Sequence, residues 1–283
     1  KRKFKLLFPS TPPESPEHFW ASELIPKAKE KGTYVELTIE AISDLPEEEK
    51  LRLINEVGGI ESAEAQREFY CKIIVDASRA VAPSFKPHHV QTIEPTHIHW
   101  QIFGDTGGVR DLTVFLQVGW SHELQKTIFR DELWFPAGTP TTTIIKAIKS
   151  KWPDFQVIMD APGQLRIDYS SLGLTTMAVQ KDDFAAGLLL LNTSLLNQNV
   201  LIHPDCKLFI RTLEGGMLNG QRTDHLRTDS LGHNDAAAAG IYGLRGVDKV
   251  TDLRPKPNPQ DTITIETHTE LETTFLHAFK RKA

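Results

Sequence analysis

Cysteine and long apolar runs are both scarce in this sequence, and each absence excludes a class of protein. The 283 residues include two cysteines, Cys71 and Cys206, which lie far apart and match no metal-binding or redox spacing. A disulfide-stapled fold is therefore not expected, and a reducing, intracellular compartment is. No apolar run reaches the roughly 18 residues that span a bilayer, and no secretory signal pattern opens the chain. No contact with a membrane is predicted.

A surplus of basic residues is also missing. The formal net charge is −5, in a composition with 40% hydrophobic and 24% charged residues that is typical of globular proteins. Proteins that bind nucleic acid usually carry a basic surface. A metal site built from carboxylates would account for part of the negative charge, because bound cations cancel it locally. The net charge therefore neither supports nor excludes binding to DNA.

The first part of the chain predicts short helices and one strand. Residues 17–31 are typical of a helix, and residues 33–39 alternate like a strand. Pro46 stands at the start of a second helix, and Ser62 is placed to cap a third. The three prolines within residues 82–95 then predict a linker or a domain boundary.

After this boundary the pattern predicts an α/β domain. Three adjacent strands joined by tight turns come first, and helices and strands alternate after them, which favours a mixed sheet flanked by helices. This order resembles the ribonuclease-H-like fold of polynucleotidyl transferases, in which acidic residues lie on the first strand, at the end of the fourth and near the start of the last helix. The predicted strands are 97–103, 112–118, 127–134, 155–159, 175–179 and 200–203, and the predicted helices are 141–151, 183–196, 205–213 and 236–244.

Three aspartates occupy these places. Asp105 follows the strand 97–103 among small residues, although its position alone favours an ordinary aspartate of a hairpin turn. Asp160 ends the apolar run 155–159, and sites assemble at the carboxyl ends of central strands; a turn aspartate is an equal alternative. Asp235 stands at the start of a helix that begins with four alanines, and its alternative role is an N-cap.

Carboxylates on separate elements are suited to phosphodiester hydrolysis. Two divalent cations roughly 4 Å apart can activate water and stabilise the leaving oxygen, and Mg²⁺ prefers oxygen ligands. His233 could bind a metal or orient a water, and its alternative is a partly exposed loop histidine. Asp229, Asp111 and Asp168 rank lower for the same ligand roles.

Several short stretches carry a family resemblance. These are Leu201-Ile202-His203-Pro204, Arg211-Thr212-Leu213-Glu214, Gln221-Arg222-Thr223-Asp224 and Gly232-His233-Asn234-Asp235-Ala236, and residues 188–233 as a whole are similar to the nuclease domain of the large terminase subunit of tailed bacteriophages. Phe103-Gly104-Asp105-Thr106-Gly107 looks like the first acidic strand of that family, and Val157-Ile158-Met159-Asp160 like the second. The resemblance assigns metal ligation to Asp105, Asp160 and Asp235, with His233 as a helper.

The resemblance extends to the N-terminal part. Ser10-Thr11-Pro12-Pro13 looks like the motif that couples ATP hydrolysis to movement, and Arg67-Glu68-Phe69-Tyr70-Cys71 resembles a segment late in the motor domain. A phosphate-cradling Gly-x-x-x-x-Gly-Lys-[Ser/Thr] loop is missing, and in the family layout it would lie upstream of Lys1. We therefore expect a trailing part of an α/β ATPase domain and linker at 1–86, a complete nuclease domain at 87–250 and an extended tail at 251–283, without ATPase activity.

The resemblance implies a Mg²⁺- or Mn²⁺-dependent endonuclease. It would cut concatemeric double-stranded DNA by two-metal hydrolysis in the host cell cytoplasm, with the portal and the small terminase subunit as partners. One alternative is an assembly module that docks on the portal through residues 251–283, and another is a different ribonuclease-H-like nuclease such as a junction resolvase. The residues expected to contact DNA phosphates are Arg110, Lys181, Arg211, Arg222 and Arg227.

Overall fold

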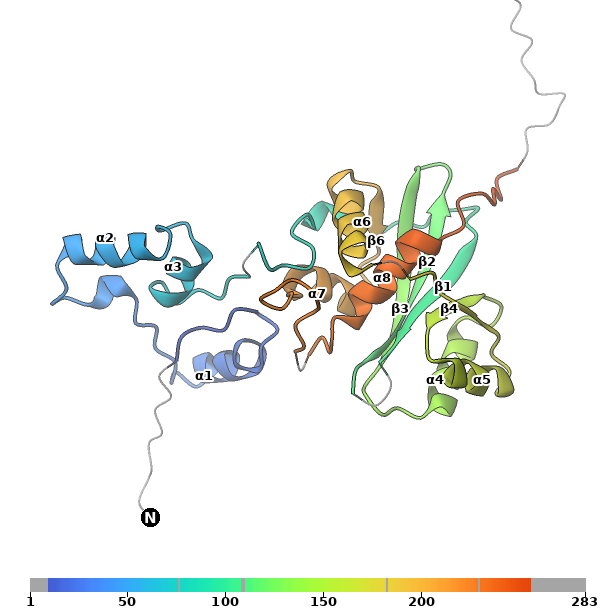
Figure 1. Cartoon of the computed structure of the whole chain (residues 1–283), viewed down its shortest axis with the longest axis horizontal. Helices are drawn as coiled ribbons and strands as arrows, with labels where there is room; N and C mark the ends of the chain where they lie inside the picture. Colours follow the sequence, from blue (N-terminus) through green and yellow to red (C-terminus); the bar gives the residue numbers. More distant parts are fainter. Residues whose placement is uncertain (1–9, 76, 108–109, 182, 229, 256–283) are drawn as a thin grey trace, which may run out of the picture. The chain divides into compact units, whose positions relative to one another are not determined.

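A six-stranded sheet is the centre of the region that begins at Trp100 (Figure 1). The computed structural model describes residues 10–255 with the exception of residues 76, 108–109, 182 and 229, so most of the predicted tail at 251–283 lies outside the described residues. The sheet has the order β5-β4-β1-β2-β3-β6. Its strands are β1 (Trp100–Thr106), β2 (Thr113–Ser121), β3 (Lys126–Phe135), β4 (Val157–Asp160), β5 (Thr176–Ala178) and β6 (Val200–Ile202).

The sheet is mixed, as the sequence predicts. Strands β1, β2 and β3 form an antiparallel meander. Strand β4 pairs in parallel with β1 and β5 in parallel with β4, while β6 is parallel to β3 at the other edge. The predicted fold class is therefore confirmed, although the ends of several strands differ from the prediction by a few residues.

Helices cover both faces of the sheet (Figure 1). Successive strand residues point to opposite faces, so Phe103 and Leu116 belong to one core while Ile102 and Phe115 belong to the other. Helices α6 (Phe184–Leu196), α7 (Lys207–Gly215) and α8 (Asp235–Gly246) pack on the first face, and α4 (Thr141–Lys151) and α5 (Gly163–Ser171) on the second.

Local sequence explains these helices unequally. Helix α4 has its predicted bounds, because Ile144, Ile145 and Ile148 form one buried stripe. Helix α6 begins after Asp183, whose carboxylate accepts a hydrogen bond from the Ala185 amide at 2.7 Å. Helix α5 is absent from the prediction. Its one buried residue is Tyr169, so its sequence has almost no apolar period to detect.

Small residues bring α8 close to the sheet. Three of the four alanines at 236–239 are buried, and α8 contacts both β1 and β2. Gly240 leaves no room for a side chain, because a Cβ there would lie 2.5 Å from a ring carbon of Phe209. The tight packing expected for the alanine-rich helix is therefore observed, and it brings the N-terminus of α8 to the sheet.

The N-terminal part forms short helices around a small core of Ile39, Ile54 and Ala65. The helix predicted after Pro46 and the cap predicted at Ser62 are both confirmed, since the Ser62 hydroxyl accepts from the Ala65 amide at 3.0 Å. The elements here are a π-helical turn (Trp20–Leu24), α1 (Ile25–Glu30), a 3₁₀ turn (Ile39–Ala41), α2 (Glu47–Glu56) and α3 (Ala63–Glu68).

The strand predicted at residues 33–39 is wrong. Residues 33–38 have no regular structure, and Ile39 begins a 3₁₀ turn. An alternating pattern produces a strand only where a neighbouring strand completes the hydrogen bonds. Here the Ile39 amide donates to the carbonyl of Phe69 instead, and the side chains of Val35 and Leu37 are exposed.

The proline-rich stretch at 82–95 is not an open linker. Ala82 and Phe85 are buried in the core shared with α6, α7 and α8. His89 is buried as well, and its Nε2 lies 2.9 Å from the carbonyl oxygen of Leu195. The stretch forms one 3₁₀ turn (Pro87–His89) that begins at a proline, and its apolar side chains pack into the core.

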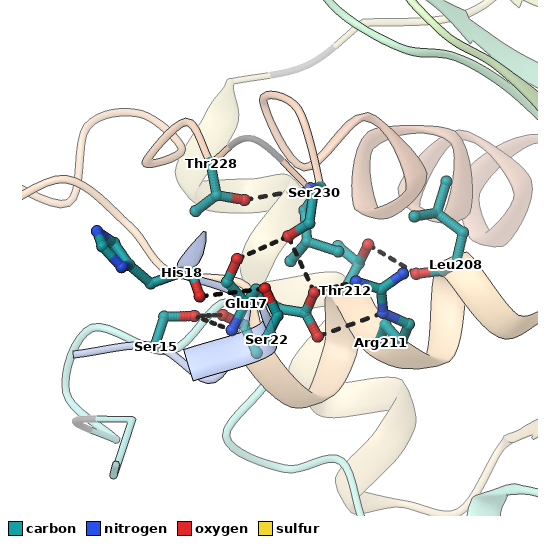
Figure 2. A network of polar contacts seen from close by, with 11 residues as sticks. Ser15, Glu17, His18, Ser22, Leu208, Arg211, Thr212, Thr228 and Ser230 are labelled. Carbon is teal, nitrogen blue, oxygen red and sulfur yellow. Dashed lines mark hydrogen bonds and ion pairs between the residues drawn. The ribbon is translucent and has the colours of Figure 1, made fainter. Parts of the chain in front are cut away.

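A polar network ties residues 15–18 to α7 and to the loop before α8 (Figure 2). The Ser15 hydroxyl donates to the carbonyl of Gly215 at 3.1 Å. The Glu17 carboxylate accepts from the Arg211 guanidinium and from the Ser230 hydroxyl, the latter at 2.9 Å. The Glu17 side chain is only 12% exposed, so this is a contact made largely away from solvent.

Candidate active site

Asp105 and Asp160 are direct neighbours on adjacent strands. They are register partners in the parallel pairing of β1 with β4, and the Thr106 hydroxyl donates to the Asp160 carbonyl at 2.6 Å. Asp105 is half-buried within β1 and does not lie in the hairpin turn that follows. The predicted strand end at Phe103 is thus too early, because pairing with both β2 and β4 continues past it.

Asp235 reaches the same end of β1 from α8. It is the first residue of the helix and is 4% exposed, while the N-cap is Asn234, a left-handed residue with φ of 55°. Oδ2 of Asp235 accepts from the amide of Leu112 at 3.0 Å and from that of His233 at 3.4 Å. Leu112 immediately precedes β2, so Asp235 is tied to the connection between β1 and β2 and does not serve as an N-cap.

The charges of Asp160 and Asp235 both act on Asp105. Burial raises the pKa of Asp105 to about 8, and the negative charges of Asp235 and then Asp160 add to this rise. Burial also raises the pKa of Asp235 to about 6, and the charge of Asp111 contributes. We call Asp105, Asp160 and Asp235 the carboxylate cluster.

Two residues that the sequence prediction ranked low or missed lie beside the cluster. Asp111 is paired with Arg227 at 2.9 Å and acts electrostatically on Asp235. The hydroxyl of Tyr242 donates to Oδ2 of Asp160 at 3.1 Å. Tyr242 follows Asp235 by two helical turns, which places both on one face of α8. That spacing is a signal available in the sequence.

Of the other two aspartates ranked low, the structure describes Asp168, which does not join the cluster. Asp168 lies on α5 and accepts from the Gln164 side chain of the same helix at 3.1 Å. Asp229 lies outside the described residues.

The cluster matches a hard divalent cation in its chemistry. Its donors are carboxylate oxygens, which Mg²⁺ and Mn²⁺ prefer, and a bound cation would relieve the repulsion that raises the pKa of Asp105. In the side-chain positions that the structure describes, however, no group of three or more His, Cys, Asp or Glu residues is close enough to hold a metal ion. Oδ2 of Asp160 is instead engaged by the Lys181 ammonium at 2.7 Å.

The His233 side chain contacts residues outside the carboxylate cluster. Its Nε2 lies 3.2 Å from a carboxylate oxygen of Asp224, and its ring packs edge-on against His225. Burial lowers the pKa of His225 to about 4, with a further contribution from His233. His233 contacts Asp235 through its backbone amide, so its predicted role as a metal helper stays a prediction.

The predicted phosphate contacts separate into three groups. Lys181 pairs with Asp160 of the cluster, and Arg227 pairs with Asp111 beside the cluster. Arg211, on α7, forms an ion pair with Glu17. Arg110 and Arg222 are both exposed.

Similarity to solved structures identifies the fold. Residues covering 82% of this chain superpose on 60% of the large terminase from a thermophilic bacteriophage, at 16% identity and a TM-score of 0.50. The chain has the fold of a large terminase. The predicted α/β fold class is thereby confirmed, and the superposition extends beyond residues 87–250.

Two nuclease domains of other phage terminases also superpose on this chain. The nuclease domain of the P22 large terminase covers 58% of this chain and 90% of its own length, at 14% identity and a TM-score of 0.49. The nuclease domain of the SPP1 large terminase with bound Mn covers 56% of this chain and 96% of its own, at 15% identity and a TM-score of 0.41. No protein-family model and no curated protein sequence matches the chain. The chain spans about 60% of the length of the thermophilic-phage terminase.

Proposed function

We propose that this chain is the nuclease part of a viral DNA-packaging terminase and cuts concatemeric double-stranded DNA with the help of divalent metal ions. The observation that carries the proposal is the convergence of Asp105, Asp160 and Asp235 from β1, β4 and α8. The terminase fold supports it but would not by itself assign a reaction. The cluster supplies carboxylate oxygens, the ligands that divalent metal ions for DNA hydrolysis would need.

Asp105, Asp160 and Asp235 would hold the metal. Divalent ions at such a site supply an activated water and stabilise charge on the leaving oxygen of a phosphodiester. The protein prepares the site through backbone contacts. The amides of Leu112 and His233 orient Asp235, and the strand pairing of β1 with β4 sets the spacing between the other two carboxylates.

Positive side chains around the cluster would bind the DNA backbone. Lys181 and Arg227 lie at its rim, with side-chain exposures of 62% and 49%. Exposed cations can leave an ion pair for a phosphate at little cost, because surface pairs contribute only about 0–1 kcal/mol. Such contacts are independent of base sequence, so we expect little sequence preference in cutting.

The remaining assignments follow from the same proposal. Residues 1–86 would be the trailing part of a packaging ATPase, residues 87–250 the nuclease domain and residues 251–283 a tail. A terminase would also work with a portal and a small terminase subunit. The described residues include no helix long and apolar enough to cross a membrane.

Cleavage of supercoiled plasmid in Mn²⁺ tests the proposal. We expect Asp160→Asn to reduce the cutting rate at least about 100-fold, because even residues that merely support metal ligands cost 10–100-fold when mutated. The matched control is Asp168→Asn, which removes one carboxylate from α5 outside the cluster and should cut like the unmodified protein. Chelation with EDTA should abolish cutting by both.

Two outcomes would contradict the assignment. Equal cutting by Asp160→Asn and the unmodified protein would remove Asp160 from the reaction. Full activity in EDTA would exclude the proposed metal dependence.

A further inference from the structure

Lys181 lies directly on one member of the carboxylate cluster. Its Nζ is 2.7 Å from Oδ2 of Asp160, and the Tyr242 hydroxyl donates to the same oxygen at 3.1 Å. A carboxylate oxygen offers about two lone-pair positions. These two donors therefore fill Oδ2, and a further ligand can use this oxygen only by displacing one of them.

The surrounding backbone brings Lys181 to this place. The amide of Val179 donates to the carbonyl of Met159 at 3.4 Å, one residue before Asp160. The carbonyl of Gln180 accepts from the Arg245 guanidinium of α8 at 3.4 Å. Residues 179 and 180 are thus attached to β4 and to α8, and the next residue along the chain is Lys181.

The two donors on Asp160 differ in how easily they leave. Tyr242 is half-buried on α8, and burial raises the pKa of its phenol, with the charges of Asp105 and Asp160 contributing. It remains a neutral donor on a rigid helix. Lys181 is 62% exposed and has a long flexible stem, so its ammonium can move into solvent without disturbing the packing. Lys181 is therefore the donor that another cation would displace.

Charge explains why a cation occupies this position. Asp105, Asp160 and Asp235 gather three acidic side chains, and Asp111 adds a fourth, which Arg227 already pairs. The positive charge of Lys181 also acts on Asp105, whose pKa it lowers against burial and the neighbouring carboxylates. Lys181 thus offsets repulsion across the cluster as well as at Asp160.

We propose that Lys181 is a resident counter-cation of Asp160 that a divalent metal ion must displace, so that Lys181 weakens metal binding at this site. The inference rests on the proposed function, because it takes Asp160 as a metal ligand. Displacement also releases the ammonium next to the cluster, where it can contact a DNA phosphate. The same residue would then weaken metal binding in the free protein and contact the substrate once a metal is bound.

Titration calorimetry with MnCl₂ in the absence of DNA tests the competition. Lys181→Met keeps the apolar stem and removes the charge, and we expect it to bind Mn²⁺ roughly three- to fivefold more tightly, the range expected for loss of an exposed ion pair. Lys181→Arg keeps the cation and should retain the affinity of the unmodified protein. The control for net charge is Lys146→Met, on an exposed position of α4 on the other face of the sheet.

The outcomes separate this inference from the proposed function. Unchanged or weaker Mn²⁺ binding by Lys181→Met overturns the role of Lys181, as does equal tightening by Lys146→Met. If Asp160→Asn abolishes Mn²⁺ binding in that same case, the metal site itself still stands. If neither the unmodified protein nor Lys181→Met binds Mn²⁺, the proposed function fails together with the inference.

Discussion

Burial and neighbouring charge raise the pKa of Asp105 further than that of Asp235. It lies half-buried on β1 between Asp160 and Asp235, and its pKa is about 8 because of burial and the two neighbouring charges. The native protein therefore keeps a proton that the unfolded chain releases near pH 4. Such a group favours folding at low pH, and its contribution is lost as the pH rises through the native pKa.

We predict that the metal-free protein loses stability between about pH 5 and pH 8. Asp105→Asn should remove much of this dependence, so that the variant exceeds the unmodified protein by about 1–3 kcal/mol in free energy of unfolding near pH 8. Urea denaturation in EDTA at pH 5 and at pH 8 measures the free energy of unfolding of both proteins. Parallel pH dependence of the two proteins would contradict the pKa assigned to Asp105. Asp235, with its pKa raised to about 6, contributes in the lower half of the same range.

At the scale of elements, α8 decides where the third carboxylate lies. Its small residues allow close contact with β1, β2 and α7, and Asp235 at its first position follows the helix. Gly240 is the tightest of these contacts with α7, since an added Cβ would lie 2.5 Å from a ring carbon of the fully buried Phe209. The spacing between α8 and α7 thus depends on the absence of one methyl group.

We predict that Gly240→Ala lowers the free energy of unfolding by about 1–3 kcal/mol, even though alanine favours helices. The matched control is Gly163→Ala at the start of α5, where an added Cβ meets no atom within 4 Å. Urea denaturation of both variants should show a loss for the first and none for the second. An equal response of the two would mean that Phe209 can move aside freely.

At the scale of the whole molecule, the N-terminal part is joined to α7 and to the loop before α8 by the network around Glu17 (Figure 2). Glu17 links Arg211 of α7 with Ser230, which lies five residues before Asp235. Glu14 lies in the same segment but pairs with Arg79 at 2.6 Å. Glu14 and Glu17 are close in sequence but form their contacts with different parts of the chain.

We predict that Glu17→Gln raises amide hydrogen exchange in residues 15–22 and 230–235 by roughly five- to tenfold, because a hydrogen bond to a charged group is lost. Glu14→Gln serves as the control and should leave residues 230–235 unchanged. Mass spectrometry of peptic peptides measures both regions. Unchanged exchange in 230–235 after Glu17→Gln would show that Ser230 is held by other contacts.

Much of the sheet and of the cluster could be predicted from sequence. The isoleucine stripe of α4, the Asp183 cap of α6 and the apolar run of β4 each specify their element locally. The strand predicted at 33–39 failed because alternation alone provides no partner strand, and α5 was missed because it buries only Tyr169. The prediction also ended β1 two residues before Asp105. The end of β1 depends on pairing with strands distant in sequence, which local sequence does not show.

The sequence by itself determined which residues could form the site: three aspartates after a first strand, after a buried strand and before an alanine-rich helix. Tertiary structure alone decided what surrounds them. The register of β1 with β4 sets Asp105 beside Asp160, and the attachment of residues 179 and 180 to β4 and α8 brings Lys181 onto Asp160. Burial and neighbouring charge set the pKa of Asp105, because both depend on atoms that are brought together only when the chain folds.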